Sequence, residues 1–309
     1  MPDRVEEVPG RMGSGTAVQA PRVSARGLRA LASLIGDEDE RIASMVWDNL
    51  LRLGTRALPY LAELEDHADP RTRLRARHVK MRIQAQRLER RFRRLAQRRN
   101  AGFDLETALT LVAQVEYPDL EPMDVALQLD DLADGLRPRI QADMVPEERI
   151  EALNGYLFRD LGFRGNRERY HDPDNSFIQR VIERRRGIPI TLAAVMILVG
   201  RRIGLTLHGV GMPRNFLVRY KDKGREIFVD PFNGGRILSR EECARILTSE
   251  GYYVREAFVG EFLAVASPRD MTIRMLRNLI LIYSKQRLGA QVTRMIRFAD
   301  ILREHEHRR

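Results

Sequence analysis

Very few residues in this sequence have the types and spacing that covalent chemistry requires. The only cysteine, Cys243, directly follows Glu241 and Glu242. Neighbouring carboxylates raise the pKa of a thiol, so we expect Cys243 to be a small buried hydrophobic residue and not a nucleophile. A single cysteine also excludes an internal disulfide and a cysteine-based zinc cluster.

The histidines do not have the spacing of a metal site. His171 lies in a turn-rich stretch (170–175), where one imidazole among acids favours a cap or a surface loop. His208 has no partner nearby in the sequence, and His305 and His307 belong to a charged tail. We therefore expect no metal and no other cofactor.

A basic block lies between Arg71 and Arg99. It holds thirteen arginines or lysines and one acid, Glu89, in a chain whose net charge is +10. Such a block is typical of nucleic-acid binding, but it also suits a solvated helix face, which we favour because no nucleic-acid motif accompanies it. The side chains that would carry such binding are Arg87, Arg90, Arg91, Arg93, Arg94, Arg98 and Arg99.

Helical patterns dominate the first third of the chain. Residues 1–26 are rich in Gly, Pro, Ser and Arg, which predicts disorder. From Leu28 onward apolar residues recur every three or four positions, which predicts short helices that break near Gly36 and Gly54 and resume after Pro70. Part of this pattern recurs after 32 residues, which, together with the run at 53–59, resembles one or two HEAT-like repeats. The alternative is an unrelated helical hairpin.

The remainder mixes helices with a few strands. Ser239 with Glu242, and Ser176 with Gln179, have the spacing of capping boxes that open helices. The predicted helices are 104–116, 122–142, 147–160, 190–203, 271–286 and 290–302, and the predicted strands are 215–220, 225–230 and one within 251–265. The last two helices resemble a single tetratricopeptide-like hairpin.

The sequence also bears on location. The longest stretch without a charge, 187–200, has fourteen residues, the length of a buried core helix and too short to span a membrane. The first 23 residues have no signal-peptide pattern. Together with the single cysteine, these features predict a cytoplasmic protein that makes no membrane contact.

Several runs of residues resemble a known family. They are LFRDLGFRGN (157–166), ERRRGIPITL (183–192), FLVR (216–219), DPFNGG (230–235) and RMLRNL (274–279). In this order they resemble the bacterial SirB-type, transglutaminase-like family. The resemblance implies an α+β, mainly helical fold, in which a central helix packs on an antiparallel sheet and helical repeats flank this core.

The resemblance also implies a domain organisation. We expect a disordered tail (1–26), HEAT-like helices with the basic helix (27–100), a transglutaminase-like domain (101–265) and a tetratricopeptide-like helical hairpin (266–309).

Enzymes of this fold use a Cys–His–Asp triad, and the resemblance places its three positions at Pro189, Asn215 and Asp230. Proline offers no nucleophile, and an amide does not accept a proton at neutral pH. SirB-type proteins generally lack the cysteine but often keep the histidine, so Asn215 departs even from that pattern. Asp230, followed by Pro231, reads as a structural turn residue. Thr191 could offer a hydroxyl, but a helix-interior threonine usually bonds its own backbone.

Three functions remain open on these grounds. The preferred hypothesis is a non-catalytic scaffold or regulator that binds a protein or peptide through the old active-site groove. The alternative is a nucleic-acid- or ribosome-associated factor that uses the basic block. The third is an unconventional hydrolase or acyltransferase that uses Thr191 and Asp230.

Overall fold

The computed structural model describes residues 24–222, 224–249 and 259–304. The chain divides into two compact units, one ending at Ile83 and the other beginning at Gln84. The division falls inside one long helix, α4 (Pro70–Ala96). The expected disordered tail (1–26) lies outside the described residues apart from its last three positions. The four segments expected from the sequence stay a prediction.

The first unit is helical, with elements where the apolar spacing predicts them. They are α1 (Ala25–Ser33), α2 (Glu40–Leu53), α3 (Leu58–Glu63) and the first part of α4. Asp39 caps the start of α2 through the backbone N–H of Arg41, and Gly54 follows its end with φ +59°, a conformation that glycine adopts without strain. Ile35, Leu50 and other fully buried residues form the core of this unit.

The second unit holds most of the chain. Its helices are α5 (Leu105–Ala113), α6 (Pro122–Leu136), α7 (Pro146–Asn154), α8 (Ile178–Arg184), α9 (Pro189–Arg202), α10 (Arg240–Ser249), α11 (Val259–Phe262), α12 (Pro268–Lys285) and α13 (Gly289–Arg303). Its strands are β1 (Arg164–Gly165), β2 (Arg186–Gly187), β3 (His208–Val210), β4 (Leu217–Asp222), β5 (Arg225–Asp230), β6 (Arg236–Leu238) and β7 (Val265–Ala266).

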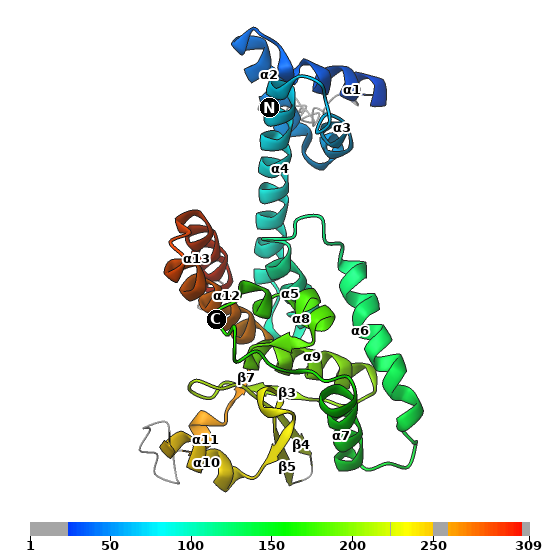
Figure 1. Cartoon of the computed structure of the whole chain (residues 1–309), viewed down its shortest axis with the longest axis vertical. Coiled ribbons are helices and arrows are strands. Elements are labelled where there is room, and N and C mark those ends of the chain that lie inside the picture. The colour runs from blue at the N-terminus through cyan, green and yellow to red at the C-terminus, as the bar shows by residue number, and fades with distance from the viewer. Residues whose placement is uncertain (1–23, 223, 250–258, 305–309) are drawn as a thin grey trace, which may run out of the picture. The chain divides into compact units, whose positions relative to one another are not determined.

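Helix α9 is the centre of this unit, as its uniformly apolar sequence predicts. Nearly all of its residues before Arg201 are buried, and it contacts α6, α8, β3 and β4 (Figure 1). Pro189 stands at its first position, where a missing N–H leaves no intrahelical bond unmade.

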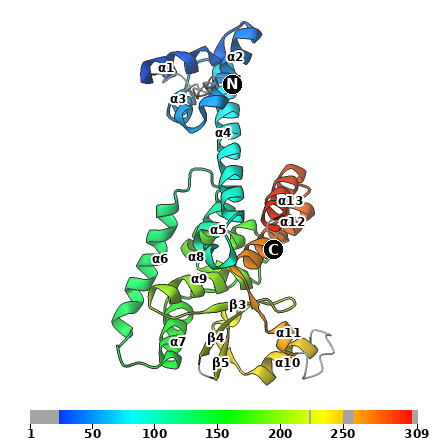
Figure 2. The same cartoon turned by 180° about the vertical axis from the view of Figure 1, so that it is seen from behind.

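The main sheet is antiparallel, in the order β6-β5-β4-β3-β7, and both of its faces are covered. On one face Val218 and Val229 pair with each other and join the core around α9. On the other face Leu217, Phe228 and Leu238 pack with residues of α10. A central helix on an antiparallel sheet confirms the expected α+β, mainly helical fold (Figure 2).

A second core joins segments from opposite ends of this unit. Leu88 and Phe92, from the last turns of α4, pack with residues of α5, α12 and α13. The rings of Phe92 and Phe298 stack with centroids 4.2 Å apart. Helices α12 and α13 lie side by side (Figures 1 and 2).

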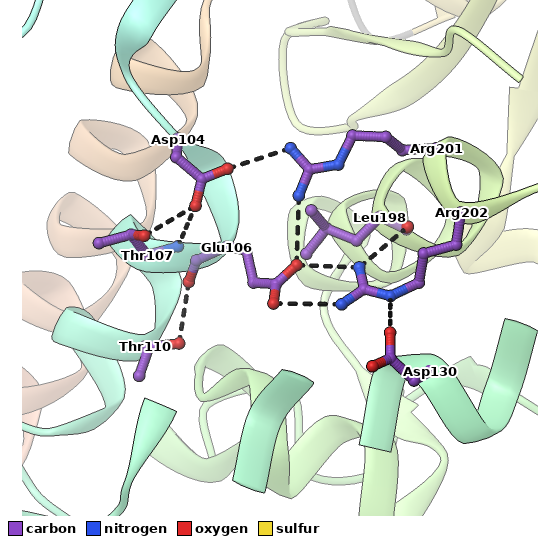
Figure 3. A network of polar contacts seen from close by, with 8 residues as sticks. All are labelled: Asp104, Glu106, Thr107, Thr110, Asp130, Leu198, Arg201 and Arg202. Carbon is purple, nitrogen blue, oxygen red and sulfur yellow. Dashed lines mark hydrogen bonds and ion pairs between the residues drawn. The ribbon is translucent and has the colours of Figure 1, made fainter. Parts of the chain in front are cut away.

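The C-terminal end of α9 is fixed by charge. Arg202 forms two hydrogen bonds to Glu106, of 2.9 and 3.1 Å, and a third to Asp130, of 2.6 Å. Arg201 contacts both Glu106 and Asp104 (Figure 3). Because Asp104 and Glu106 begin α5 and Asp130 belongs to α6, this ion-pair network joins three helices.

Some predicted boundaries differ from the observed ones, each for a local reason. The helix expected over 122–142 ends at Leu136, because Pro138 cannot continue an α-helical ladder. The capping box expected at Ser176 and Gln179 is wrong: Phe177 is the cap of α8, and Ser176 ends a preceding 3₁₀ turn. The strand expected within 251–265 lies partly outside the described residues, and its described part contains α11 and the short β7.

None of the helices in the described ranges combines the length and apolar character that a bilayer crossing requires.

Candidate functional site

The N-terminal end of α9, where the resemblance places a nucleophile, is buried and uncharged. Pro189 is buried, and the side chain of Thr191 has no exposed surface. The Thr191 hydroxyl donates a 2.6 Å hydrogen bond to the backbone carbonyl of Asn175. The expected bond to its own helix is therefore wrong. The hydroxyl instead ties α9 to the turn that precedes α8.

Asn175 itself is the centre of a neutral hydrogen-bond network that the sequence does not reveal. Its side-chain oxygen accepts a bond of 2.9 Å from Asn166, and its amide nitrogen donates to the carbonyls of Arg169 and Tyr170. Asn175 is fully buried, so this network fixes the 169–175 turn against α9. This turn also positions the Tyr170 side chain.

Asn215 and Asp230 are brought together by the β4–β5 hairpin. The antiparallel register pairs Val218 with Val229, so Asn215, just before β4, comes within reach of Asp230, the last residue of β5. Asn215 Nδ2 donates to Asp230 Oδ2 at 3.0 Å, and Asn215 Oδ1 accepts the backbone N–H of Phe216 at 2.8 Å. Both ends of the amide are therefore occupied, and its orientation is fixed.

Asp230 also builds the turn that follows β5. Its Oδ1 accepts the backbone N–H groups of Phe232 and Asn233 at 3.1 and 3.2 Å, and its Oδ2 accepts the side-chain amide of Asn233 at 2.7 Å. The side chain is almost fully buried. This agrees with the turn role indicated by the Asp-Pro pair. The same carboxylate also orients Asn215, as an acid orients a histidine in a triad.

Cys243 lies on the other face of the sheet. It is fully buried among Leu217, Phe228 and other apolar residues. Burial raises the pKa of its thiol to about 12, with a further contribution from the nearby carboxylate of Glu242. The expectation of a small buried hydrophobic residue is confirmed.

The histidines that the structure describes are not part of a metal cluster. Nε2 of His171 lies 3.0 Å from the ammonium of Lys285, and His208 is exposed at the start of β3. Within the ranges that the structure describes, no three His, Cys, Asp or Glu side chains come together as ligands.

An aromatic and basic surface lies beside the Asn215–Asp230 pair, and sequence reasoning missed it. Tyr170 is 40% exposed, and its ring meets the ring of Phe232 edge to face, with centroids 6.0 Å apart. The guanidinium of Arg167 lies over the Phe232 ring, 5.3 Å from its centroid. Arg274 Nη2 donates to the carbonyl of Asn215 at 2.9 Å. We call Arg167, Tyr170, Phe232 and Arg274 the Tyr170 face.

The seven arginines singled out in the basic block do not behave alike. Arg91 is half-buried and donates to the side chain of Gln114, and Arg93 pairs with Glu89 at 3.0 Å. The side chains of the other five are exposed, and their guanidinium groups form no hydrogen bond or ion pair with any described residue; they are Arg87, Arg90, Arg94, Arg98 and Arg99. We call Arg87, Arg90 and Arg94 the arginine stripe, because their spacing of three and four places them on one face of α4.

Comparison with known proteins identifies the family. A family model described as the transglutaminase-like superfamily matches residues 123–277, half of the chain. A UPF0162 protein from Xylella fastidiosa strain 9a5c is 37% identical over 182 residues, which cover 58% of this chain and 64% of that relative. The chain thus spans less than two thirds of the length of that relative.

Two further relatives share shorter segments. A UPF0162 protein from Vibrio cholerae is 39% identical over 87 residues, covering 28% of this chain and 32% of the relative. F-box only protein 21 of Mus musculus is 31% identical over 140 residues, covering 42% of this chain and 21% of that protein. No solved structure matches the chain.

Proposed function

Because this chain belongs to the transglutaminase-like superfamily, we propose that it is a non-catalytic member, of SirB type, that binds a protein or peptide partner. The observation that carries the proposal is the hydrogen bond from Asn215 to Asp230. An amide held at both ends cannot relay a proton, and Pro189 has no nucleophilic atom. HEAT-like helices at 27–100 and a tetratricopeptide-like hairpin at 266–309 belong to the same proposal.

The proposed contact surface is the Tyr170 face and not the triad positions themselves. Pro189 and Asp230 are buried, so a partner would meet the side chains that cover them. Exposed tyrosine and arginine side chains are the residue types that most often anchor partners at protein interfaces. Two buried networks, through Asn175 and through Asp230, hold this face rigid, which lowers the entropy lost on binding.

The loss of catalysis can be tested with a panel of amide and ester substrates. We expect no turnover above background from the wild-type chain. Hydrolysis or acyl transfer that disappears in Thr191→Ala, while Thr272→Ala retains it, would contradict the proposal and favour the unconventional hydrolase that uses Thr191 and Asp230. Thr272 is a suitable control because it is an equally buried helix threonine.

The binding function can be tested by capture from a bacterial lysate at low salt, with and without nuclease. We expect a defined polypeptide that survives nuclease treatment and is captured at least tenfold less by Tyr170→Ala. The matched control is Tyr60→Ala, which alters a partly exposed tyrosine of the first unit. Capture that nuclease abolishes, or that both variants weaken equally, would count against this function.

A second function, association with nucleic acid or ribosomes, is favoured by one observation. The arginine stripe carries three exposed guanidinium groups without an acidic partner among the described residues. Over seven residues, helical geometry spaces such groups along about 10 Å, a length that spans several phosphates of a nucleic acid. Exposed aromatic residues are absent from positions 84–99, so binding would rest on phosphates and be independent of sequence.

The salt dependence of binding separates this second function from the first. A fluorescent duplex DNA and a structured RNA are titrated with the full chain between 50 and 200 mM salt. Phosphate contacts by the stripe predict a log–log slope of about −3, which Arg87→Gln, Arg90→Gln and Arg94→Gln together would reduce to near zero. Arg93→Gln, whose arginine is engaged by Glu89, should change the slope little. Absence of measurable affinity at 50 mM salt would end this hypothesis.

A further inference from the structure

Arg274 is held against the segment that carries the former histidine position. Its Nη2 donates to the carbonyl oxygens of Met212 and Asn215, at 2.8 and 2.9 Å. The guanidinium carbon lies 5.3 Å from the centre of the Phe216 ring. These contacts fix the plane of the guanidinium without using Nη1 or Nε.

The remaining nitrogens of Arg274 have room at the surface. A side-chain carbon added to Gly211 would lie only 2.9 Å from Nη1, so the absence of a side chain there lets the guanidinium reach its position. Gly211 is itself exposed. Nη1 therefore lies beside an open stretch of backbone, where a group from another molecule can approach it.

The charge of Arg274 is not balanced by the surrounding protein. Among the described residues no carboxylate pairs with it, and another cation, Arg277, follows one helical turn later. Burial lowers the pKa of the Arg274 guanidinium below its ordinary value; the phenol of Tyr170 opposes this shift, and Arg277 adds to it. A half-buried cation beside a second cation is costly unless an anion joins it.

The acids closest in sequence to Tyr170 and Arg274 are already engaged. Asp270, four residues before Arg274, accepts hydrogen bonds from the backbone N–H and the hydroxyl of Ser267. Arg184 binds Asp172 at 2.7 Å and Asp174 at 3.0 Å, and Arg180 also binds Asp174. Glu168, the remaining acid of this segment, acts on Arg186. The exposed groups around Arg274 are therefore mainly cationic and aromatic, which favours a negatively charged ligand.

We propose that Arg274 binds a carboxylate of the partner, so that the segment docking on the Tyr170 face is an acidic peptide. This rests on the proposed peptide-binding function. Arg277 adds attraction from one turn away, and the rings of Tyr170 and Phe232 take the apolar part of the peptide. The carboxylate belongs either to an aspartate or glutamate side chain or to a peptide C-terminus, since both present the same pair of oxygens.

The probe is an array of randomised heptapeptides, printed once with free C-terminal carboxylates and once with C-terminal amides, and incubated with the full chain. We expect selection of peptides rich in Asp or Glu. In solution, replacing the key acid of a selected peptide by its amide should weaken binding to the wild-type chain at least tenfold. If only the C-terminal amide has this effect, the terminal carboxylate is the group bound.

Variants of the chain give a second measurement. Arg274→Gln should reduce affinity for the acidic peptide at least tenfold and leave its amide counterpart unchanged. Gly211→Ala keeps the charge but displaces Nη1, so it should weaken binding of the same peptide three- to tenfold. This variant tests the site even if Arg274→Gln does not fold. Arg90→Gln, on the arginine stripe, is the control and should have no effect.

The outcomes distinguish this inference from the function on which it rests. Peptides selected without any preference for acids, or amide peptides bound as well as acidic ones, would overturn the carboxylate site and leave peptide binding intact. Failure of the wild-type chain to select any peptide would overturn both.

Discussion

The two ends of helix α9 are built from different chemistry. At the N-terminal end Pro189 and Thr191 are buried, and the Thr191 hydroxyl donates to a backbone carbonyl. At the C-terminal end Arg201 and Arg202 meet three carboxylates (Figure 3). Charge is thus found where the helix is anchored and not where an acyl transfer would need it.

The helix dipole makes this contrast instructive. The N-terminus of a helix favours negative charge and would help to stabilise a thiolate, whereas the C-terminus favours cations. In α9 only the second of these effects is used, by Arg201 and Arg202 in its last turn. The helix therefore retains its anchor without the group that its N-terminus is suited to activate.

The largest effect is expected at the charged end. Glu106→Gln leaves Arg202 without its two charge-assisted bonds in a site where both side chains are less than one fifth exposed. We expect a loss of about 2–3 kcal/mol in the free energy of unfolding, measured by urea denaturation, because a mostly buried charge loses one of its two carboxylate partners and keeps only Asp130. Asp300→Asn, in an exposed pair, is the control and should cost under about 0.5 kcal/mol. Equal losses in the two variants would break the comparison.

A smaller loss is expected at the neutral end. Thr191→Val keeps the shape of the side chain but leaves the Asn175 carbonyl without its 2.6 Å donor. The expected cost is about 1–2 kcal/mol, again from urea denaturation. Thr272→Val removes a hydroxyl that bonds only the carbonyl four residues back in its own helix, so it should cost less. A stability unchanged by Thr191→Val would mean that the turn before α8 is held by other bonds.

Restoring an imidazole tests the Asn215–Asp230 geometry through pH. In Asn215→His the carboxylate would raise the folded-state pKa of the histidine above its unfolded value. The resulting stabilisation, about 1 kcal/mol, is present below the unfolded pKa and is lost as pH rises through the folded pKa. Thermal unfolding between pH 5 and 8 measures it, and adding Asp230→Asn should abolish the pH dependence. A flat profile for the single variant would show that the imidazole does not reach the carboxylate.

The smallest effect is expected for Arg201, whose side chain is 53% exposed. Arg201→Gln should lower the free energy of unfolding by at most about 0.5 kcal/mol, because water screens such pairs. Together with Glu106→Gln, this variant sharpens the comparison. A small loss would show that the burial of an ion pair, and not its number of contacts, sets its contribution to stability. A loss above 2 kcal/mol would contradict this.

Much of the fold could be predicted from the sequence because it follows local rules. The uniformly apolar run at 190–203 identified the central helix, and Pro189 marked its first position. The turn between the strands at 215–220 and 225–230 predicted the hairpin that places Asn215 beside Asp230. These features need only neighbours in the sequence.

The rest depends on contacts between distant segments. Arg274 lies in a run that carried the family resemblance, yet its bond to the Asn215 carbonyl spans 59 residues and leaves no local pattern. The partner of Arg91, Gln114, likewise emerges only when helices pack, whereas Arg93 and Glu89 are four residues apart in one helix. The buried network of Asn166 and Asn175 reads as a surface turn until its burial is known.

One buried side chain bears on how this chain is synthesised. Arg269 donates to the backbone carbonyls of Ala96, Arg98 and Leu302, so it closes the end of α4 against the end of α13. A growing polypeptide leaves the ribosome with its N-terminus first, so Leu302 emerges long after Ala96. The core that unites these helices therefore cannot be completed until α13 has been synthesised.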